Sequence, residues 1–438
     1  MTQPHQTLLH INDQQGSYPD SYYAASANHL ELQPQLGGEQ SCDVCVIGAG
    51  YTGLSAAIAL AERGYEVCVL EAHRAGWGAS GRNGGQVGTG QRVDQDDLER
   101  LVGHELARKA WNVAEQSKRS LKGLIEKYNI DCDLKPGIIH ANHRRRYDRH
   151  SEHYAAYLND HYHYQEIRYV APGEMSEMIG SKNYSGGTLD LGSAHLHPLN
   201  YALGLAQAAI NAGVRLYENS EVLGIDEGST VRIRSARGKV SARFLIYACN
   251  GYLGNLNRCV ASRVMPINNY VVATSPLSED IASHLIRDDV AVADSRFVVN
   301  YFRLSADRRL LFGGGESYRY RFPRDIKSFV RKRMLEIYPQ LADVSIDYGW
   351  GGTLAITMNR LPMVERLAGN ILSASGYSGS GVALATGAGE LLAEAIDGVA
   401  SRFDVMSQLP TPVFPGGTAL RSPLLVLAMT WYALRDRL

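Results

Sequence analysis

The stretch from Cys42 to Ala72 constrains the fold of this chain more than any other. A short apolar run, Val44 to Ile47, leads directly into the turn Gly48-Ala49-Gly50-Tyr51-Thr52-Gly53. An apolar helical pattern follows and closes at Gly64, and a second apolar run, Val67 to Leu70, ends at Glu71. Strand, glycine-rich turn, helix and second strand occur in the order of a βαβ unit that binds a dinucleotide.

Each glycine of this turn meets a separate steric requirement. Gly48 permits the tight turn, Gly50 lets the backbone approach a pyrophosphate, and Gly53 allows close packing of helix and strand. The helix N-terminus offers free N–H groups and a partial positive charge to phosphates. Glu71 lies where a carboxylate accepts hydrogen bonds from a ribose, and its charge disfavours the 2′-phosphate of NADP. The alternative is a glycine-rich turn in some other α/β unit.

Two more glycine-rich segments accompany the first. Residues 74–86 contain five glycines, which rules out a regular element through most of the segment and suits a backbone held against a flat ligand. Residues 370–382 again show a strand, a glycine-rich turn and a helix start, which can meet a cofactor from the other side. The alternatives are a flexible surface loop for residues 74–86 and a plain βα turn for residues 370–382.

Together, the motifs at 48–53, 71–72, 78–86 and 376–381 resemble those of the D-amino-acid oxidase-like superfamily of FAD flavoenzymes, which includes glycine and sarcosine oxidases. Within it, residues 22–27 and 78–86 look closest to γ-glutamylputrescine oxidases of bacterial polyamine catabolism. The resemblance implies FAD rather than NAD. The residues it implies for FAD binding are Gly48, Ala49, Gly50, Tyr51, Thr52, Gly53, Glu71, Ala72, Ser80, Gly81, Arg82, Asn83, Gly84, Gly85, Gln86, Val222, Asn250, Gly251, Gly376, Tyr377, Ser378, Gly379, Ser380, Gly381 and Val382.

Some relatives bind the flavin covalently, through a His after the second glycine cluster or a Cys late in the chain. Neither occurs in the matching places, because Asn83 to Gln86 contains no His and Cys259 is the last cysteine. Non-covalent FAD is therefore expected.

The resemblance also implies an α/β (α+β) fold with two domains. A discontinuous Rossmann-like FAD domain is expected at residues 41–95, 190–260 and 350–438. A substrate domain built on an antiparallel sheet is expected at residues 96–189 and 261–349, and residues 1–40 form a polar N-terminal arm. Within these domains, the residue patterns predict one long helix over 94–128, a strand with a Pro-Gly turn over 132–142, and separate strands at 238–242 and 244–251.

The activity that the resemblance implies is amine oxidation, in which the terminal amine of γ-glutamylputrescine or a related γ-glutamyl polyamine becomes an aldehyde with release of ammonia and hydrogen peroxide. The expected partners are this small amine and molecular oxygen. No residue is a certain catalyst, because the flavin carries the chemistry. Two other classes of protein stay open. One is a flavoprotein dehydrogenase, or an oxidase of another amine or N-methyl amino acid, that passes electrons to a partner or quinone. The other is a non-enzymatic nucleotide-binding module, which would not need the second and third glycine clusters.

Substrate-binding residues can be proposed only by their place in the sequence. A planar arginine matches the α-carboxylate of a γ-glutamyl group, and Arg303 in the run 300–303 is the first candidate. Tyr301 and Tyr270 share the predicted sheet and would line the pocket, while Trp350 would wall the flavin site. His197 would lie at the domain junction. The alternatives are a solvent-facing arginine, a core tryptophan and a structural histidine.

The composition of the chain argues against several other classes of protein. The formal net charge of −1 gives no field that would favour nucleic acid or an anionic membrane. The six scattered cysteines imply no disulfide framework and suit a reducing cytoplasm, and the histidines of residues 140–163 lack the acids or cysteines that would complete a metal site. No apolar run reaches the roughly 18 residues that a membrane span requires. The apolar run 423–432 is expected to be a helix packed on its own protein, with a membrane contact as the alternative. The oligomeric state is unknown.

Overall fold

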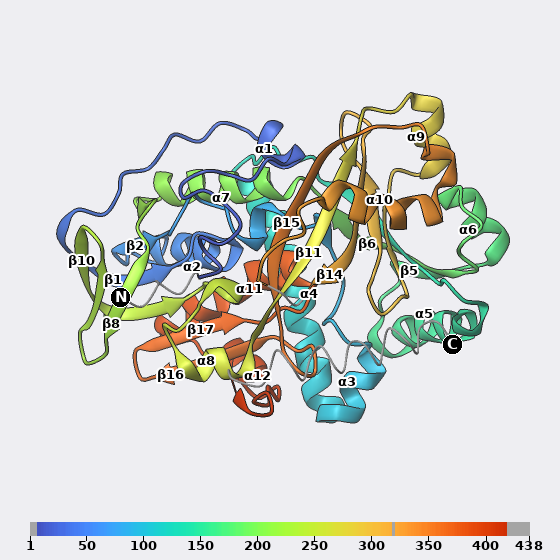
Figure 1. Ribbon diagram of the computed structural model, residues 1–438. Coiled ribbons are helices and arrows are strands. Elements are labelled where there is room, and N and C mark those ends of the chain that lie inside the picture. The colour runs from blue at the N-terminus through green and yellow to red at the C-terminus, as the bar shows by residue number, and fades with distance from the viewer. Residues whose placement is uncertain (1–6, 318–319, 418–438) are drawn as a thin grey trace.

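A computed structural model describes residues 7–317 and 320–417 of the chain. The described residues form two β-sheets, each with its own helices, and Figure 1 shows the first sheet in the left half of the molecule and the second in the right half. The predicted apolar helix at residues 423–432 lies outside the described residues.

The first sheet is built on parallel strands. Its order is β16-β17-β10-β1-β2-β7, with β8 and β9 attached beside β10. β17, β10, β1, β2 and β7 pair in parallel, whereas β16 is antiparallel to β17. The strands are β1 (Gly38–Ile47), β2 (Val67–Leu70), β7 (Arg215–Tyr217), β8 (Val222–Asp226), β9 (Val231–Ser235), β10 (Gly238–Tyr247), β16 (Met363–Ala368) and β17 (Ile371–Ser375).

Small side chains allow the helices of this half to pack tightly. α2 and α11 meet where a Cβ on Gly389 would lie 2.0 Å from Ser55 Oγ, so that only glycine fits this crossing. α7 packs on the other flank of α2, and α4 packs against α11. The bounds are α2 (Tyr51–Ala61), α3 (Gln95–Val102), α4 (His104–Lys127), α7 (Pro198–Asn211), α8 (Arg258–Arg263), α11 (Gly381–Ile396) and α12 (Ser401–Ser407).

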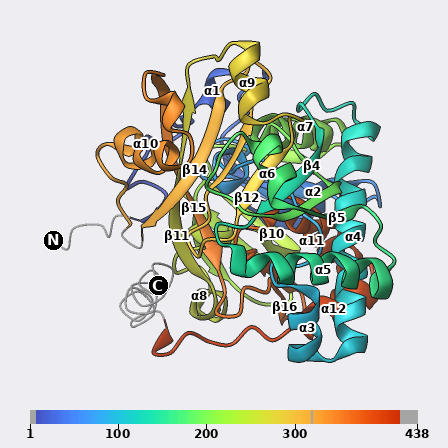
Figure 2. The same cartoon turned by 90° about the vertical axis from the view of Figure 1, so that its right-hand side faces the viewer.

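The second sheet is antiparallel except for one parallel pair, β12 with β4. Its order is β15-β11-β14-β13-β12-β4-β6-β3, and β5 pairs with β6. Its strands are β3 (Gln86–Val87), β4 (Lys135–Ala141), β5 (Ile167–Val170), β6 (Gly187–His195), β11 (Met265–Thr274), β12 (Ala291–Asp294), β13 (Tyr301–Leu304), β14 (Leu310–Ser317) and β15 (Ile346–Ile356). Its helices are α5 (Asp148–Tyr162), α6 (Pro172–Ile179), α9 (Glu279–Leu285) and α10 (Ile326–Ile337), and Figure 2 shows α10 at the left, α9 at the top and α5 at the lower right. The short α1 (Tyr22–Ala25) packs against α7 instead.

The expected mixed fold, a Rossmann-like unit joined to an antiparallel sheet, is confirmed. Three local expectations are wrong. The helix over 94–128 breaks at Gly103, whose φ of +84° suits glycine, and becomes α3 and α4. Pro136 and Gly137 lie inside β4 as an irregularity rather than at a turn. The two strands predicted around Arg243 are one strand, β10, which pairs along its length with β1.

The domain bounds also differ from the arrangement of the sheets at four points. β3 lies inside the expected FAD segment 41–95 but belongs to the second sheet. β6 and β15 each cross an expected bound, and both belong entirely to the second sheet. α4, expected in the substrate domain, contributes Ala107, Ala110 and Val113 to the core that covers the first sheet. Within the described ranges, no helix combines the length and the apolar character that a bilayer crossing requires.

Candidate active site

The first glycine-rich turn brings the backbone of β1 to the start of α2. Gly48 has φ of +106°, and a Cβ there would lie 2.8 Å from Ala248 O. Gly50 is the N-cap of α2 and has no side chain with which to cap this helix. A Cβ on Gly53 would lie 1.9 Å from Gly48 O. Close packing therefore excludes side chains at the glycine positions of the turn. The backbone N–H groups at the start of α2 remain accessible to an anion.

Glu71 holds this turn from the end of β2. Its Oε2 accepts a hydrogen bond from Ala49 N at 2.8 Å, and its Oε1 accepts one from His73 N at 3.0 Å. Burial raises the pKa of the carboxyl group to about 6 despite these bonds. Each oxygen retains a further lone pair, so the group that shapes the turn can still accept a hydrogen bond from a ligand hydroxyl.

The second glycine-rich turn folds back onto the first. Ser80 Oγ accepts from Tyr51 N at 3.0 Å, and Tyr51 Oη donates to Ser80 O at 2.6 Å. Arg82 is buried; its Nε donates to Trp77 O and its Nη1 to Asp13 Oδ2, whereas its buried Nη2 has no partner among the described residues. Asn83 Oδ1 accepts from Gly85 N at 2.7 Å and fixes the loop.

The third turn, between β17 and α11, closes on the same place. Tyr377 Oη and Thr52 Oγ1 lie 2.6 Å apart, which links this turn to α2. Asn250 Oδ1 accepts from Gly376 N at 3.0 Å. Ser378, with φ of +54°, is in the left-handed region that favours glycine, and its carbonyl accepts from Arg92 Nε at 3.2 Å. The start of α11 also lacks a side-chain cap.

One cavity of about 560 Å³ joins the three turns. Of the residues expected to bind the cofactor, those that line it are Gly48, Gly50, Tyr51, Thr52, Glu71, Ala72, Ser80, Arg82, Asn83, Gly84, Gln86, Val222, Asn250, Tyr377, Ser378, Gly379, Ser380, Gly381 and Val382. Those that do not line it are Ala49, Gly53, Gly81, Gly85, Gly251 and Gly376, which lie behind the lining and shape the turns. Two uncapped helix starts, an orphaned guanidinium nitrogen and a buried carboxylate suit a long, flat ligand with a central pyrophosphate.

The second sheet forms the opposite wall. Tyr301 Oη donates to Asn269 Oδ1 at 2.5 Å, and both residues line the cavity. The exposed side chain of His140 lines it as well, and desolvation by the surrounding protein lowers the pKa of its imidazole. The remaining charged lining residues of this end are Arg92, Asp294, Arg296, Glu316 and Arg360. Except for Tyr301, none of these was expected from the sequence; the one usable signal was the position of Arg92, six residues beyond the second glycine-rich segment.

Arg303, the first candidate for substrate binding, does not line the cavity. It shares a face of β13 with Tyr301 but lies further along the strand, beneath the second turn. Its Nε donates to Gly84 O at 3.1 Å and its Nη1 to Leu304 O at 3.2 Å. The guanidinium therefore holds backbone carbonyls instead of reaching a substrate.

Tyr270, Trp350 and His197 likewise lie away from the cavity. Tyr270 points to the opposite face of the second sheet, where its ring meets Phe322 edge-on. Trp350 is core, and its indole donates to Arg82 O at 3.1 Å, so it supports the second turn from behind. His197 is the N-cap of α7: its Nδ1 accepts from Asn200 N at 3.1 Å, while Ser26 Oγ lies 3.0 Å from its Nε2.

The buried His197 gives the first prediction. Burial, and secondly Arg303, lower the pKa of His197 to about 3, against 6.5 for an ordinary histidine. The unfolded chain therefore binds the extra proton, and stability falls as the pH drops below about 6.5. Between pH 7 and pH 5 this group alone costs about 2 kcal/mol of unfolding free energy. His197→Asn retains a capping oxygen but has no imidazole, so between pH 7 and pH 5 it should lose about 2 kcal/mol less unfolding free energy than the wild type, as measured by urea unfolding. The exposed His29→Asn should lose as much as the wild type. Equal losses in all three proteins would contradict the low pKa assigned to His197.

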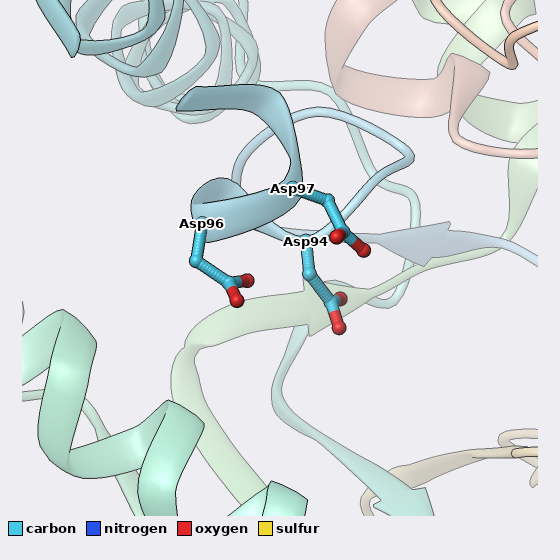
Figure 3. Close-up of side chains that lie close together, drawn as sticks. All are labelled: Asp94, Asp96 and Asp97. Atoms are coloured by element: carbon cyan, nitrogen blue, oxygen red, sulfur yellow. The ribbon is translucent and has the colours of Figure 1, made fainter. Parts of the chain in front are cut away.

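Three aspartates lie close enough to hold a cation. Figure 3 shows Asp94, Asp96 and Asp97 together at the start of α3. Asp94 pairs with His150 at 3.0 Å, and Asp96 and Asp97 pair with Arg100. These ion pairs account for the cluster, and proximity alone assigns no metal.

The fold and the cavity agree with the family to which the sequence belongs. Residues 43–395 match the model of the DAO family, described as FAD dependent oxidoreductase. The chain therefore belongs to this family, and it is an FAD-dependent oxidoreductase.

Two relatives match nearly end to end. The chain is 42% identical over 418 residues to a probable oxidoreductase OrdL of Rhizobium meliloti (strain 1021), covering 95% of this chain and 97% of that protein. It is 40% identical over 426 residues to a γ-glutamylputrescine oxidoreductase of Escherichia coli (strain K12), covering 96% and 99%. Among solved structures, glycine oxidase from Geobacillus kaustophilus matches with a TM-score of 0.70 and 21% identity, covering 82% of this chain and 95% of that one, which supports the fold.

Proposed function

We propose that this chain oxidises the terminal amine of γ-glutamylputrescine or of a related γ-glutamyl amine. The observation that carries the proposal is the charge at the substrate end of the cavity, which matches a γ-glutamyl group. The similarity to a protein named γ-glutamylputrescine oxidoreductase supports it independently.

FAD would lie along the three turns. Gly48, Gly50 and the start of α2 would receive the pyrophosphate, while Glu71 and Val222 would lie at the adenosine end. The start of α11, near Gly379 and Ser380, would meet the flavin ring. No bond between protein and flavin is expected, since Cys249, the one cysteine among the described lining residues, has a thiol pKa that burial raises to about 12.

The substrate end carries one anion, Glu316, and two cations, Arg92 and Arg360, that form no ion pair with any described residue. Arg296 is neutralised by Asp294, with which it forms an ion pair. Arg92 and Arg360 lie close together. Desolvation by the surrounding protein, and secondly the charge of Arg360, lower the pKa of the Arg92 guanidinium, whereas Asp94 and Glu316 act in the opposite direction. The α-amino acid end of a γ-glutamyl group is a zwitterion. Its carboxylate would pair with the two arginines and its ammonium group with Glu316.

The reacting amine must be neutral before its C–H bond can be oxidised. His140 lines the cavity, and desolvation by the surrounding protein lowers the pKa of its imidazole, which favours the neutral form that could accept the proton that the substrate loses. FAD, when bound, accepts the equivalent of a hydride from the carbon that bears the nitrogen. Overall, the amine, dioxygen and water would give an aldehyde, ammonia and hydrogen peroxide. The Tyr301–Asn269 pair would orient the substrate against the second sheet.

A substrate panel tests the proposal. We expect the purified protein to produce peroxide and ammonia in equal amounts from γ-glutamylputrescine, with a kcat/KM at least about tenfold above that for free putrescine, glycine or sarcosine. Flavin reduction by glutamylated amines without peroxide under air would instead indicate a dehydrogenase. If no glutamylated amine reduces the flavin anaerobically, the proposed substrate class is wrong.

A further inference from the structure

The N-terminal strap, which we define as residues 7–20, lies across one end of the cavity. Leu9 is itself a lining residue, next to the end formed by Glu71 and Val222. His10 Nε2 lies 2.8 Å from Glu221 Oε2, which fixes the strap beside β8. A segment remote in sequence from the three turns therefore completes the wall of the cavity.

His73 clamps the strap with both ring nitrogens. Its Nε2 donates to Leu9 O at 2.8 Å, and its Nδ1 accepts from Gly16 N at 3.1 Å. The ring stacks on Trp77, another lining residue, with centroids 3.7 Å apart and planes 5° from parallel. Because one nitrogen donates and the other accepts, the imidazole is held neutral in one tautomer. Burial lowers its pKa to about 4, which agrees with this geometry.

Further contacts tie the strap to the second glycine-rich segment and to the residues that precede α10. Asp13 Oδ2 pairs with Arg82 Nη1 at 2.9 Å, and the side chain of Arg82 is 1% exposed. Tyr18 Oη donates to Ala75 O at 2.7 Å. Asn12 Nδ2 donates to Tyr320 O at 2.8 Å, and Asn12 Oδ1 accepts from Phe322 N at 2.9 Å. In Figure 1 this dark blue coil passes between the half that carries α2 and the half that carries β15.

We propose that the strap is the outer wall of the adenosine pocket and controls the rate at which FAD leaves the protein. This inference rests on the proposed placement of FAD along the three turns. Leu9 covers the adenosine end, and His73, Asp13 and Asn12 keep it there. The strap must open before the cofactor can dissociate, so contacts that close it slow dissociation and change the association rate less.

Two pairs of variants in the full chain test the strap. Leu9→Ala removes the covering side chain, and Leu8→Ala, at a neighbouring leucine that does not line the cavity, is its control. Gly16→Ala displaces the strap, because Gly16 has φ of +77° and its Cβ would lie 2.5 Å from Asn219 Oδ1; Gly37→Ala, with open space around it, is the control. Released flavin fluorescence gives the dissociation rate. We expect Leu9→Ala and Gly16→Ala to release FAD at least about tenfold faster, and both controls to stay within about twofold of wild type.

Hydrogen exchange on the wild-type protein provides a test without substitutions. FAD should slow exchange in peptides covering residues 7–20, including the amide of Gly16. Wild-type dissociation rates in both test variants, with exchange in the strap unaffected by FAD, would overturn the inference. The unfolding midpoint of each apoprotein separates a loose strap from a damaged fold. If a substitution at Gly50 leaves FAD binding intact, the placement of FAD fails; if that substitution abolishes binding while the strap variants behave as wild type, only the role of the strap fails.

Discussion

A Gly50→Val variant is expected to be folded and colourless. Gly50 is the N-cap of α2 and lines the cavity, and a Cβ there would lie 2.8 Å from Ser80 Oγ. Because Ser80 Oγ accepts from Tyr51 N, the branched side chain would push apart the first two turns and fill the space where the backbone approaches the pyrophosphate. We expect FAD affinity to fall by at least about a hundredfold, or about 3 kcal/mol. Flavin absorbance after gel filtration and titration of the apoprotein with FAD measure the loss.

A graded series separates lost binding from lost folding. Gly50→Ala adds a single methyl group and should weaken FAD binding by less than valine does. Gly37→Val carries the same change at a position with nothing within 4 Å and should bind FAD normally. The apoprotein of Gly50→Val should keep the far-UV spectrum of the wild-type apoprotein. Wild-type flavin content in Gly50→Val would show that the pyrophosphate does not lie against this turn.

The cofactor side of the cavity could be anticipated from sequence because its requirements are local and steric. At Gly48 and Gly53 a side chain would collide with backbone a few residues away or across one strand, and such constraints leave glycine as the one choice. The acidic residue at the end of β2 follows from the length of the βαβ unit. The meeting of the three turns came from the family resemblance, since spacing alone does not bring residue 379 to residue 50.

The substrate side of the cavity was harder to predict from the sequence. Alternation along a strand indicates which face of the sheet a residue lies on, but not how far along the strand the cavity extends. Tyr301 and Arg303 share a face of β13, but the cavity ends between them, beneath Gly84. On β11, Asn269 faces the cavity, so its neighbour Tyr270 must face away. Arg360 reaches the cavity from a tight turn with φ of +65°, and no sequence pattern indicates it.

The same long-range placement makes Arg92 the most informative residue for specificity. Its Nε is fixed by Ser378 O at 3.2 Å, beside the third turn, and Arg360 lies near it at the cavity wall. Charge-assisted hydrogen bonds to a carboxylate contribute about 2–3 kcal/mol. Arg92→Met should therefore lower kcat/KM for γ-glutamylputrescine by about 30- to 150-fold, chiefly through KM. Free putrescine has no carboxylate, so its turnover should change by less than about threefold.

The comparison of the two amines distinguishes recognition from architecture. If Arg92 served only to hold Ser378, its loss would disturb the third turn, and both substrates and the flavin spectrum would suffer alike. If it binds the carboxylate, the loss is confined to glutamylated amines and FAD affinity is unchanged. Arg168→Met, which breaks an exposed ion pair with Glu174 outside the cavity, controls for removal of a positive charge. Equal losses for γ-glutamylputrescine and putrescine would therefore contradict the zwitterion site, because discrimination requires an interaction that one substrate makes and the other lacks.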